Sequence, residues 1–374
     1  MPKPVVLVIE NSIGVTGALK SVIFVAEKLR PYFTFIFVIS TKSATRSFIE
    51  QNQFCVVAEL PMLELSKRTK SVLLYGPQLI FNSFRLRKIV KVNDVQIIHN
   101  NDLYNLLPVA LKLFGNPISY ICHVRFLPDN FPRLLYNFWI KLHLYFASQV
   151  ICVSKKVLDS IPKNKKSIVI HDAIPMLNNA LLPREERGYQ YFLYLANYIN
   201  GKGQQYALEA FYRIHNELPT WRLRFVGGDM GLQRNKDFKF RLKQLAEQWQ
   251  IERKIEWGEF THSVQNEYKN ADIVLNFSES ESFSITCLEA LCMGKALIAT
   301  DSGGPSEIID HMKTGMLVTN RDVNEMTQAM RTLASSEELR KRFSEDAGAT
   351  VFKKFSLDAS AQKLKEVYDT LVTA

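Results

Sequence analysis

The sequence has no long hydrophobic run. None reaches the ~18 consecutive apolar residues that are needed to span a lipid bilayer. The chain begins MPKPVVLVIENS, and the five apolar residues before Glu10 are too few for the core of a signal peptide. This excludes a membrane-spanning class, and we expect a protein that is soluble or attached to a membrane at its surface.

Cysteine is scarce and irregularly placed. The chain has five cysteines, an odd number, and no Cys-x-x-Cys pair. They lie in apolar surroundings, which predicts reduced core thiols in a cytosolic protein and excludes a disulfide or zinc framework. The cysteines are Cys55, Cys122, Cys152, Cys287 and Cys292.

Acidic residues are scarce in the first half of the chain. Residues 1–172 contain 22 Lys and Arg against 10 Asp and Glu, whereas the remainder contains 25 against 27. The net charge of +10 therefore resides in the first half, and it implies an anionic partner for that half alone. Nucleic acid and an anionic membrane surface both fit this charge, so motifs must distinguish them.

The length and composition are those of an ordinary two-domain globular protein. The chain has 374 residues, of which 47% are hydrophobic and 22% are charged. Apolar runs at residues 5–9 and 35–39 flank a glycine-containing turn and an apolar-periodic helix at residues 18–29. This order is typical of the opening of a doubly wound parallel sheet, although the turn lacks the full G-x-G-x-x-G dinucleotide fingerprint.

The most informative stretch is residues 273–309, IVLNFSESESFSITCLEALCMGKALIATDSGGPSEII. It predicts a buried strand at residues 273–277, a helix from Ser284 that stops at Gly294, and a second buried strand at residues 296–300. The loop before the helix lies at the carboxyl end of a strand, where open α/β sheets bind ligands. The apolar positions expected on one side of the helix are Ile285, Leu288, Leu291 and Cys292.

Two carboxylates flank the start of that predicted helix. Glu281 precedes it, Glu289 lies within it, and free backbone N–H groups are expected between them, at Phe283, Ser284 and Ile285. A helix N-terminus can bind a pyrophosphate because it has unpaired donors and about half a positive charge. Carboxylates on either side can accept hydrogen bonds from sugar hydroxyls. The combination suits a nucleotide sugar, although two glutamates on a surface helix would also explain it.

The sequence motifs around these two carboxylates resemble those of a known protein family. Glu281-x7-Glu289, followed by Ala-Leu-x-x-Gly-Lys-Ala-Leu-Ile-Ala-Thr and Gly-Gly-Pro-x-Glu-Ile, resembles the donor-site signature of family-4 retaining glycosyltransferases. The resemblance implies the α/β GT-B fold, with two Rossmann-like, doubly wound parallel-sheet domains facing a central cleft. It implies an acceptor-binding domain at residues 1–175 and a nucleotide-sugar-binding domain at residues 176–356. A helix within residues 357–374 is expected to pack back on the first domain.

The resemblance extends to residues outside the signature. Gly17 matches the second glycine of the family's first turn, and His123 matches the family's histidine near the transferred sugar. Lys202 matches the phosphate-binding lysine, and Asn197 stands where the family usually has an arginine. His99 also follows a predicted strand, where a satisfied structural histidine is the simpler interpretation.

The implied reaction is glycosyl transfer with retention of configuration. No protein nucleophile is implied, and Lys202 with the amides of residues 283–285 would stabilise the leaving diphosphate. Glu281 would orient the transferred hexose, Glu289 the ribose, and His123 the sugar. No Asp-x-Asp pair is present, so we predict neither a metal ion nor a cofactor.

Two segments of the first half could contact a membrane. Residues 62–92 interleave basic and apolar residues, which indicates either an amphipathic segment on anionic lipid or a solvated basic face. Residues 134–146, LLYNFWIKLHLYF, predict either a membrane-facing helix or a core helix with Lys141 and His143 exposed. We expect attachment to the inner face of the cell membrane and a saccharide or lipid-linked acceptor, as in cell-surface polysaccharide synthesis. The basic residues of the first segment are Lys67, Arg68, Lys70, Arg85, Arg87, Lys88 and Lys91.

Two other classes of function fit parts of the sequence. A nucleotide-sugar epimerase shares the GT-B fold but needs a dedicated acid–base set, and none is recognisable. A nonenzymatic protein that binds membrane or nucleic acid would explain the basic first half, but not the acidic signature in the neutral half. We therefore predict a glycosyltransferase with a nucleotide-diphosphate sugar as donor and no nucleic-acid partner.

Overall fold

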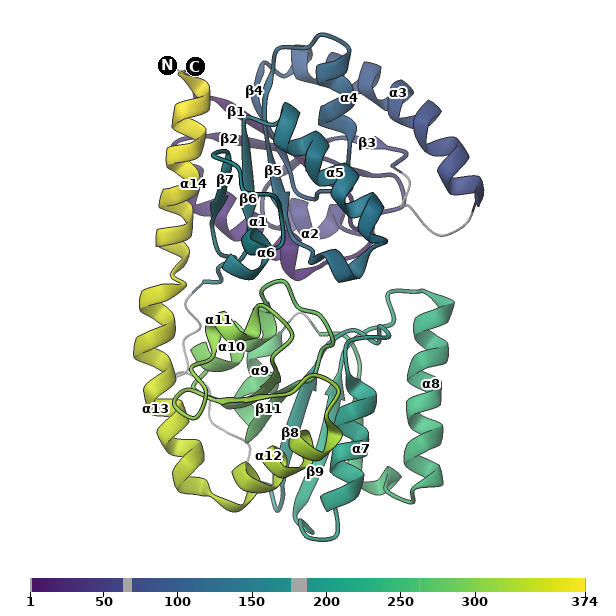
Figure 1. Cartoon of the computed structure of the whole chain (residues 1–374), viewed down its shortest axis with the longest axis vertical. Coiled ribbons are helices and arrows are strands. Elements are labelled where there is room, and N and C mark those ends of the chain that lie inside the picture. Colours follow the sequence, from purple (N-terminus) through teal and green to yellow (C-terminus); the bar gives the residue numbers. More distant parts are fainter. Residues whose placement is uncertain (1, 63–68, 176–186, 262, 374) are drawn as a thin grey trace. The chain divides into compact units, whose positions relative to one another are not determined.

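The chain divides into two compact units. The computed structural model describes residues 2–62, 69–175, 187–261 and 263–373. Unit 1 comprises Met1–Ile174 and Leu357–Ala374, and unit 2 comprises Pro175–Ser356. Each unit has its own parallel sheet and its own covering helices (Figure 1). The chain therefore passes from unit 1 to unit 2 and returns to unit 1 for its final helix.

Unit 1 is built on a seven-stranded sheet with the order β3-β2-β1-β4-β5-β6-β7. All of its neighbouring strands run parallel. The order reverses between β1 and β4, so the loops after these strands diverge and leave room for ligands at their carboxyl ends. The strands are β1 Val5–Glu10, β2 Thr34–Ser40, β3 Cys55–Leu60, β4 Val95–Asn100, β5 Ser119–Val124, β6 Gln149–Cys152 and β7 Ser167–Val169.

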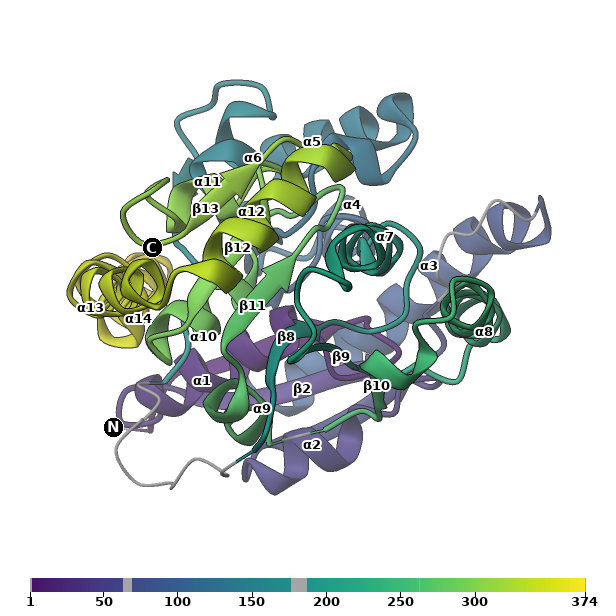
Figure 2. The ribbon, with the colours of Figure 1, turned by 90° about the horizontal axis from the view of Figure 1, so that it is seen from below.

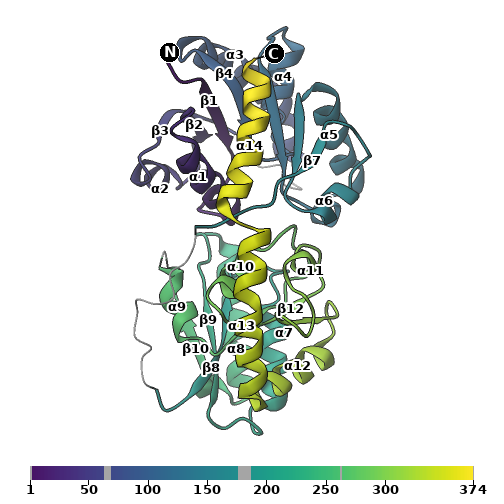
Figure 3. The same cartoon turned by 90° about the vertical axis from the view of Figure 1, so that its left-hand side faces the viewer.

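Helices cover both faces of this sheet. Helices α1 and α14 pack together on the face that Figure 3 shows, and their apolar residues share one core with Val6, Val8 and Phe37 of the strands. Helices α3, α4 and α5 lie on the opposite face (Figure 1). The helices are α1 Gly17–Leu29, α2 Arg46–Gln51, α3 Thr69–Val92, α4 Leu107–Leu113, α5 Arg133–Phe146, α6 Lys155–Asp159 and α14 Leu357–Val372.

Unit 2 repeats the plan with a six-stranded parallel sheet of order β10-β9-β8-β11-β12-β13. Figure 2 shows α7 and α12 together on one face and α9 and α10 on the other. The order reverses between β8 and β11. The strands are β8 Gln190–Leu195, β9 Trp221–Val226, β10 Ile255–Gly258, β11 Ile273–Asn276, β12 Ala296–Thr300 and β13 Met316–Val318. The helices are α7 Gln204–Ile214, α8 Gln233–Gln248, α9 Val264–Asn270, α10 Ile285–Cys292, α11 Pro305–Ile308, α12 Val323–Ser335 and α13 Glu337–Lys354.

The prediction of two Rossmann-like parallel sheets is confirmed. Helix α10 also ends as predicted, since Gly294 follows it with a φ of 60°. Burial of α10 extends beyond the four apolar positions expected on one side, since Cys287, Glu289 and Ala290 are buried as well. The helix is buried nearly all round because it packs between β12 and α13.

The prediction for residues 134–146 is wrong in one residue. They form α5, and Lys141 is exposed, but His143 is buried. The reason is helical periodicity, because His143 lies seven residues after Tyr136 and four after Trp139, on the buried side of the helix. Its Nε2 bonds to the carbonyl of Leu103 at 2.7 Å, and burial lowers the pKa of His143 to about 4.

Helix α3, Thr69–Val92, covers most of the predicted basic segment at residues 62–92. Lys67 and Arg68 lie outside the described residues. Arg85, Arg87 and Lys88 are all exposed on α3. None of the helices in the described ranges combines the length and the apolarity that a bilayer span requires.

Candidate functional site

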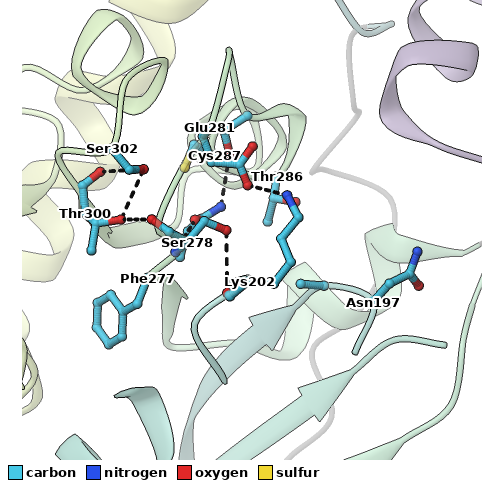
Figure 4. Close-up of polar contacts among 12 residues, drawn as sticks. Asn197, Lys202, Phe277, Ser278, Glu281, Thr286, Cys287, Thr300 and Ser302 are labelled. Carbon is cyan, nitrogen blue, oxygen red and sulfur yellow. Dashed lines mark hydrogen bonds and ion pairs between the residues drawn. The ribbon is translucent and has the colours of Figure 1, made fainter. Parts of the chain in front are cut away.

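Lys202 and Glu281 meet at the carboxyl edge of the unit 2 sheet. Lys202 follows β8, and Glu281 follows β11, the neighbouring strand in the sheet. The Nζ atom of Lys202 donates a hydrogen bond to Oε1 of Glu281 at 2.6 Å (Figure 4). The two side chains are 35% and 13% exposed, so a solute can reach the ion pair. Two residues that the sequence predicts for one donor site, 79 positions apart, are therefore in direct contact.

The close approach of these two loops depends on Gly203. Its φ is 82°, and a Cβ atom at this position would lie 2.0 Å from the carbonyl oxygen of Phe277. Only glycine fits such a contact. The hydroxyl of Tyr194 links the same loops, because it donates to the carbonyl of Lys202 and accepts from the amide of Phe277. The position of Lys202 is thus fixed by its backbone.

Ser284 fixes the start of α10. It is the N-cap, and its Oγ accepts hydrogen bonds from the amide of Cys287 and the side chain of Asn276. Its φ of 84° is unusual for a residue other than glycine, and such strain is often found at functional sites. Within the described chain, the amides of Ser284, Ile285 and Thr286 donate no hydrogen bond. These amides form the N-terminal end of a buried helix.

The Gly303-Gly304-Pro305 turn braces the same loop. The amide of Gly304 donates to the carbonyl of Glu281 at 2.6 Å, and the amide of Glu281 donates to the carbonyl of Ser302 at 3.1 Å. A Cβ atom on Gly304 would lie 2.2 Å from the Cα atom of Phe283. This close contact explains why the sequence signature has a glycine at position 304. The second glycine lets one backbone press against another.

Glu289 lies one turn into α10 and is buried. The hydroxyl of Tyr268, on α9, donates to its Oε2 at 2.9 Å. Burial and the neighbouring Glu289 carboxylate raise the pKa of Tyr268 well above its ordinary value, so this hydroxyl keeps its proton. The orientation of the Glu289 carboxylate is therefore set from α9.

Asn197 connects two loops at the same edge of the sheet. Its side-chain oxygen accepts a hydrogen bond from the amide of Gly228 at 3.0 Å, and its carbonyl accepts one from Gln204 at 2.9 Å. The amide of Tyr198 also bonds to the carbonyl of Gly228, at 2.9 Å. Asn197 thus holds the backbone of Gly228, and an arginine here could not accept this bond, because a guanidinium only donates.

In unit 1, Gly17 is the first residue of α1. Thr16 caps this helix, since its hydroxyl accepts a hydrogen bond from the amide of Leu19 at 3.2 Å. The threonine side chain thus satisfies one of the unpaired amides at the start of α1. No hydrogen bond within the described chain joins Gly17 to another of the predicted site residues.

His123 lies in β5 next to His99 in β4, and both are buried. The Nδ1 atom of His123 is 2.9 Å from Nε2 of His99, and Nδ1 of His99 is 2.6 Å from the hydroxyl of Tyr368 on α14. Burial and the Arg125 charge lower the pKa of His99 to about 3 and that of His123 well below its usual range. Both rings are therefore neutral near pH 7.

A buried ion pair lies beside these histidines. Arg125 donates to Asp172 at 2.5 Å and to Asn101 at 2.9 Å, and Asn101 donates to Glu10 at 2.5 Å. None of these four residues was predicted as a site residue from the sequence. One available signal was that Glu10 directly follows the apolar run predicted as a strand at residues 5–9.

The described residues contain no group of three or more His, Cys, Asp or Glu side chains placed to hold a metal ion. What unit 2 offers instead is a reachable ion pair, unpaired amides at a helix N-terminus and a buried, oriented carboxylate.

Two protein families match the chain. Residues 183–349 match the family described as glycosyl transferases group 1, and residues 42–175 match glycosyltransferase family 4. An uncharacterized glycosyltransferase of Methanocaldococcus jannaschii is 24% identical over 315 residues, which are 79% of this chain and 82% of the relative. The N-acetylgalactosamine-N,N'-diacetylbacillosaminyl-diphospho-undecaprenol 4-alpha-N-acetylgalactosaminyltransferase of Campylobacter jejuni is 23% identical over 323 residues, 82% of this chain and 86% of the relative.

The fold also matches solved structures. Anabaena HepE, in a crystal structure with UDP and glucose, superposes with a TM-score of 0.81 over 97% of this chain and 99% of HepE. The two sequences are 18% identical, so the similarity concerns the fold.

Proposed function

The chain belongs to the group 1 glycosyltransferases, and from this premise we propose that it moves a sugar from a nucleotide-diphosphate sugar to a saccharide or lipid-linked acceptor. We propose that the anomeric configuration is retained, as the signature of residues 281–289 implies. The observation that carries the proposal is the Lys202–Glu281 ion pair beside the unpaired amides of α10.

The diphosphate of the donor would bind at the start of α10. The amides of Ser284, Ile285 and Thr286 and the helix dipole favour an anion there, and Lys202 adds a full positive charge. Negative charge grows on the diphosphate as the sugar departs, so these groups stabilise the transition state more than the bound donor. This accounts for catalysis without a protein nucleophile.

Glu281 would change partners when the donor binds. In the structure its carboxylate neutralises Lys202. A diphosphate carries more charge than one carboxylate, so it competes for Lys202 and releases Glu281. The released carboxylate can accept hydrogen bonds from the hydroxyls of the transferred sugar. The ion pair therefore holds both side chains in place before the donor arrives.

Glu289 would accept hydrogen bonds from the ribose of the donor. Tyr268 already orients its carboxylate, so little conformational freedom is lost on binding. His123 of unit 1 would contribute a hydrogen bond to the transferred sugar, and Asn197 would shape the edge of the donor site through the backbone of Gly228.

We also propose that unit 1 attaches to the anionic inner face of the cell membrane. On α5, the exposed residues Leu134, Phe138, Lys141 and Tyr145 are spaced by three or four and so form one stripe. On α3, the apolar Phe81 and Phe84 are exposed together with its basic residues. Exposed apolar residues among basic ones suit an anionic lipid surface. The C. jejuni relative, whose name includes diphospho-undecaprenol, supports a lipid-linked acceptor.

A panel of nucleotide-diphosphate sugars tests the proposed function. The melting temperature of the protein should rise with one or a few donors, and the same donors should be slowly hydrolysed in the absence of an acceptor. Glu281→Gln should keep the fold and weaken both effects. Conversion of a labelled donor to its epimer without an acceptor would instead support an epimerase. Failure of every donor to raise the melting temperature would contradict the proposal.

A further inference from the structure

A chain of hydrogen bonds links the C-terminal helix of unit 1 to His123. It runs from the hydroxyl of Tyr368 to Nδ1 of His99 at 2.6 Å, and from Nε2 of His99 to Nδ1 of His123 at 2.9 Å. All three side chains are buried, and they come from α14, β4 and β5. We infer that Tyr368 and His99 are positioning residues, which hold His123 in the tautomer that presents an N–H group at Nε2.

The direction of the chain follows from Arg125. One of its guanidinium nitrogens lies 3.5 Å from Nδ1 of His123, and a guanidinium can only donate. Nδ1 of His123 is therefore an acceptor, and the single proton of the neutral ring is on Nε2. His99 then donates from Nε2, and its Nδ1 accepts from the hydroxyl of Tyr368. The reverse direction would place an N–H of His123 against the N–H of Arg125.

These hydrogen-bond directions require neutral rings, because a protonated histidine donates from both nitrogens. Burial lowers the pKa of His99 and His123, and the charge of Arg125 lowers both further. Arg125 itself is held by Asp172, so its guanidinium stays beside the rings. With one proton on each ring, Arg125 sets Nδ1 of His123 as an acceptor, and the hydroxyl of Tyr368 supplies the donor that the matching tautomer of His99 needs.

The chain ends at an unsatisfied atom. Nε2 of His123 is buried and has no hydrogen-bond partner within the described chain. A buried donor without an acceptor is costly, and an oxygen of a bound sugar would satisfy it. This step rests on the proposed function, because it takes the sugar as the ligand. The inference itself concerns the tautomer, which exists in the protein without ligand.

The tautomer can be observed directly by NMR. In the full chain labelled with ¹⁵N-histidine, long-range ¹H–¹⁵N spectra separate the two nitrogens of each ring, and His123→Gln identifies the His123 signals. We expect protonated Nε2 and unprotonated Nδ1 on both His99 and His123. Tyr368→Phe should shift the ¹⁵N signals of His123, to which Tyr368 is linked through His99. Tyr136→Phe, which removes another buried hydroxyl of unit 1, is the matched control and should leave them unchanged.

Kinetics tests whether the positioning matters for transfer. His99→Leu and Tyr368→Phe should lower kcat by roughly two- to twelvefold, the range for one lost hydrogen bond, with little change in KM for the donor. His99→Gln should retain most of kcat, because its amide can still donate to His123. Circular dichroism checks that each variant is folded.

The NMR and kinetic results test the tautomer, the positioning role and the proposed function separately. A proton on Nδ1 of His123 in the wild type overturns the inference. Equal loss of kcat in His99→Gln and His99→Leu, with both variants folded, also overturns the positioning role. If the expected tautomers are found but no nucleotide sugar is a substrate, the hydrogen-bond chain stands and the proposed function fails.

Discussion

Units 1 and 2 share one architecture but carry different chemistry at the same edge of the sheet. In unit 1 the ion pair of Arg125, which follows β5, with Asp172, which follows β7, is buried. In unit 2 the corresponding pair, Lys202 and Glu281, is partly exposed. A buried pair stays fixed because separating it leaves a desolvated charge, whereas an exposed pair can exchange partners. The fold therefore supplies the place, and burial decides whether a charge supports structure or meets a ligand.

The two units also differ in the kind of hydrogen-bonding group at the carboxyl edge of the sheet. The edge of unit 1 holds the neutral imidazole of His123, whose Nε2 has no partner among the described residues, and the edge of unit 2 holds a lysine and a helix N-terminus. Neutral donors suit sugar hydroxyls, and positive charge suits a diphosphate. The proposed division of the substrates between the two units follows from this contrast.

The largest expected effect breaks the buried pair of unit 1. Arg125→Leu leaves Asp172 buried without a partner and should lower the free energy of unfolding by about 3–5 kcal/mol. Lys202→Leu, the matched change in unit 2, should lower it by less than about 1 kcal/mol, because that pair is partly exposed. Thermal unfolding followed by circular dichroism compares the two. Similar losses in both variants would contradict the contrast between the units.

The next effect concerns catalysis by the exposed lysine. Lys202→Ala should lower kcat by about 10²- to 10³-fold, as the loss of one preorganised donor to a developing anion does in other enzymes. KM for the donor should rise much less. Lys341→Ala, which removes an exposed lysine elsewhere in unit 2, serves as the control and should leave kcat unchanged. An unchanged kcat with a raised KM in Lys202→Ala would assign the lysine to binding alone.

The third prediction concerns the ribose contact. Glu289→Ala should weaken donor binding by about 1.5–3 kcal/mol for each hydrogen bond lost, or roughly 10- to 150-fold in Kd. Isothermal titration with the donor measures this. Glu289→Gln still accepts the hydrogen bond from Tyr268 and separates loss of local structure from loss of the carboxylate. Unchanged affinity in both variants would remove Glu289 from the donor site.

The buried histidines of unit 1 predict a pH dependence of stability. Burial lowers the pKa of His99 to about 3 and of His143 to about 4, whereas an unfolded histidine titrates near 6.5. Below about pH 6.5 the unfolded state binds protons that the folded state does not, so stability falls as the pH falls. Each histidine contributes about 1.4 kcal/mol per pH unit in that window.

Melting temperatures from pH 7.5 to pH 5 test this dependence. His143→Gln should reduce the slope, and His311→Gln, an exposed histidine of unit 2, should not. If the melting temperatures of wild type and His143→Gln depend equally on pH, groups other than His143 cause the dependence.

The smallest expected effect per residue is on the binding of the proposed membrane surface of unit 1 to lipid vesicles. Reversal of Arg85, Arg87 and Lys88 to Glu should weaken binding to anionic vesicles by about 1 kcal/mol for each lost basic residue. Donor hydrolysis in solution should not change. Wild-type binding should rise with anionic lipid and fall with added salt, since exposed charges are screened beyond about 10 Å at 0.1 M.

The control for this surface lies in unit 2. Reversal of three exposed basic residues of α8, Arg234, Lys236 and Arg241, should leave vesicle binding unchanged. Wild-type protein that ignores anionic vesicles at low salt would exclude the membrane surface and favour a soluble acceptor.

The sequence predicted the central strands well and the edge of unit 1 poorly. Strands such as β11 and β12 are buried on both faces, so they appear as short continuous apolar runs. Strand β3, Cys55–Leu60, was not predicted because it is the edge strand of its sheet. Its residues are partly exposed, and its pattern is correspondingly weak.

The candidate site, like the fold, could be predicted only in part from the sequence. The loops of Lys202 and Glu281 follow neighbouring strands, so the strand pattern and the signature together indicated one site. Their direct ion pair could not be predicted, because the two residues are 79 positions apart. The bond from Tyr368 to His99 spans 269 positions and depends on where α14 packs, which no local pattern encodes.

The return of α14 to unit 1 has a consequence for synthesis. Unit 2 is an insertion into unit 1, so all of its residues leave the ribosome before Leu357–Val372 do. Domains fold largely as units during translation, and unit 2 can therefore complete its core while unit 1 still lacks a helix. Until α14 arrives, the face formed by α1 and the buried histidine His99 has no cover. The domain that is translated first is completed last.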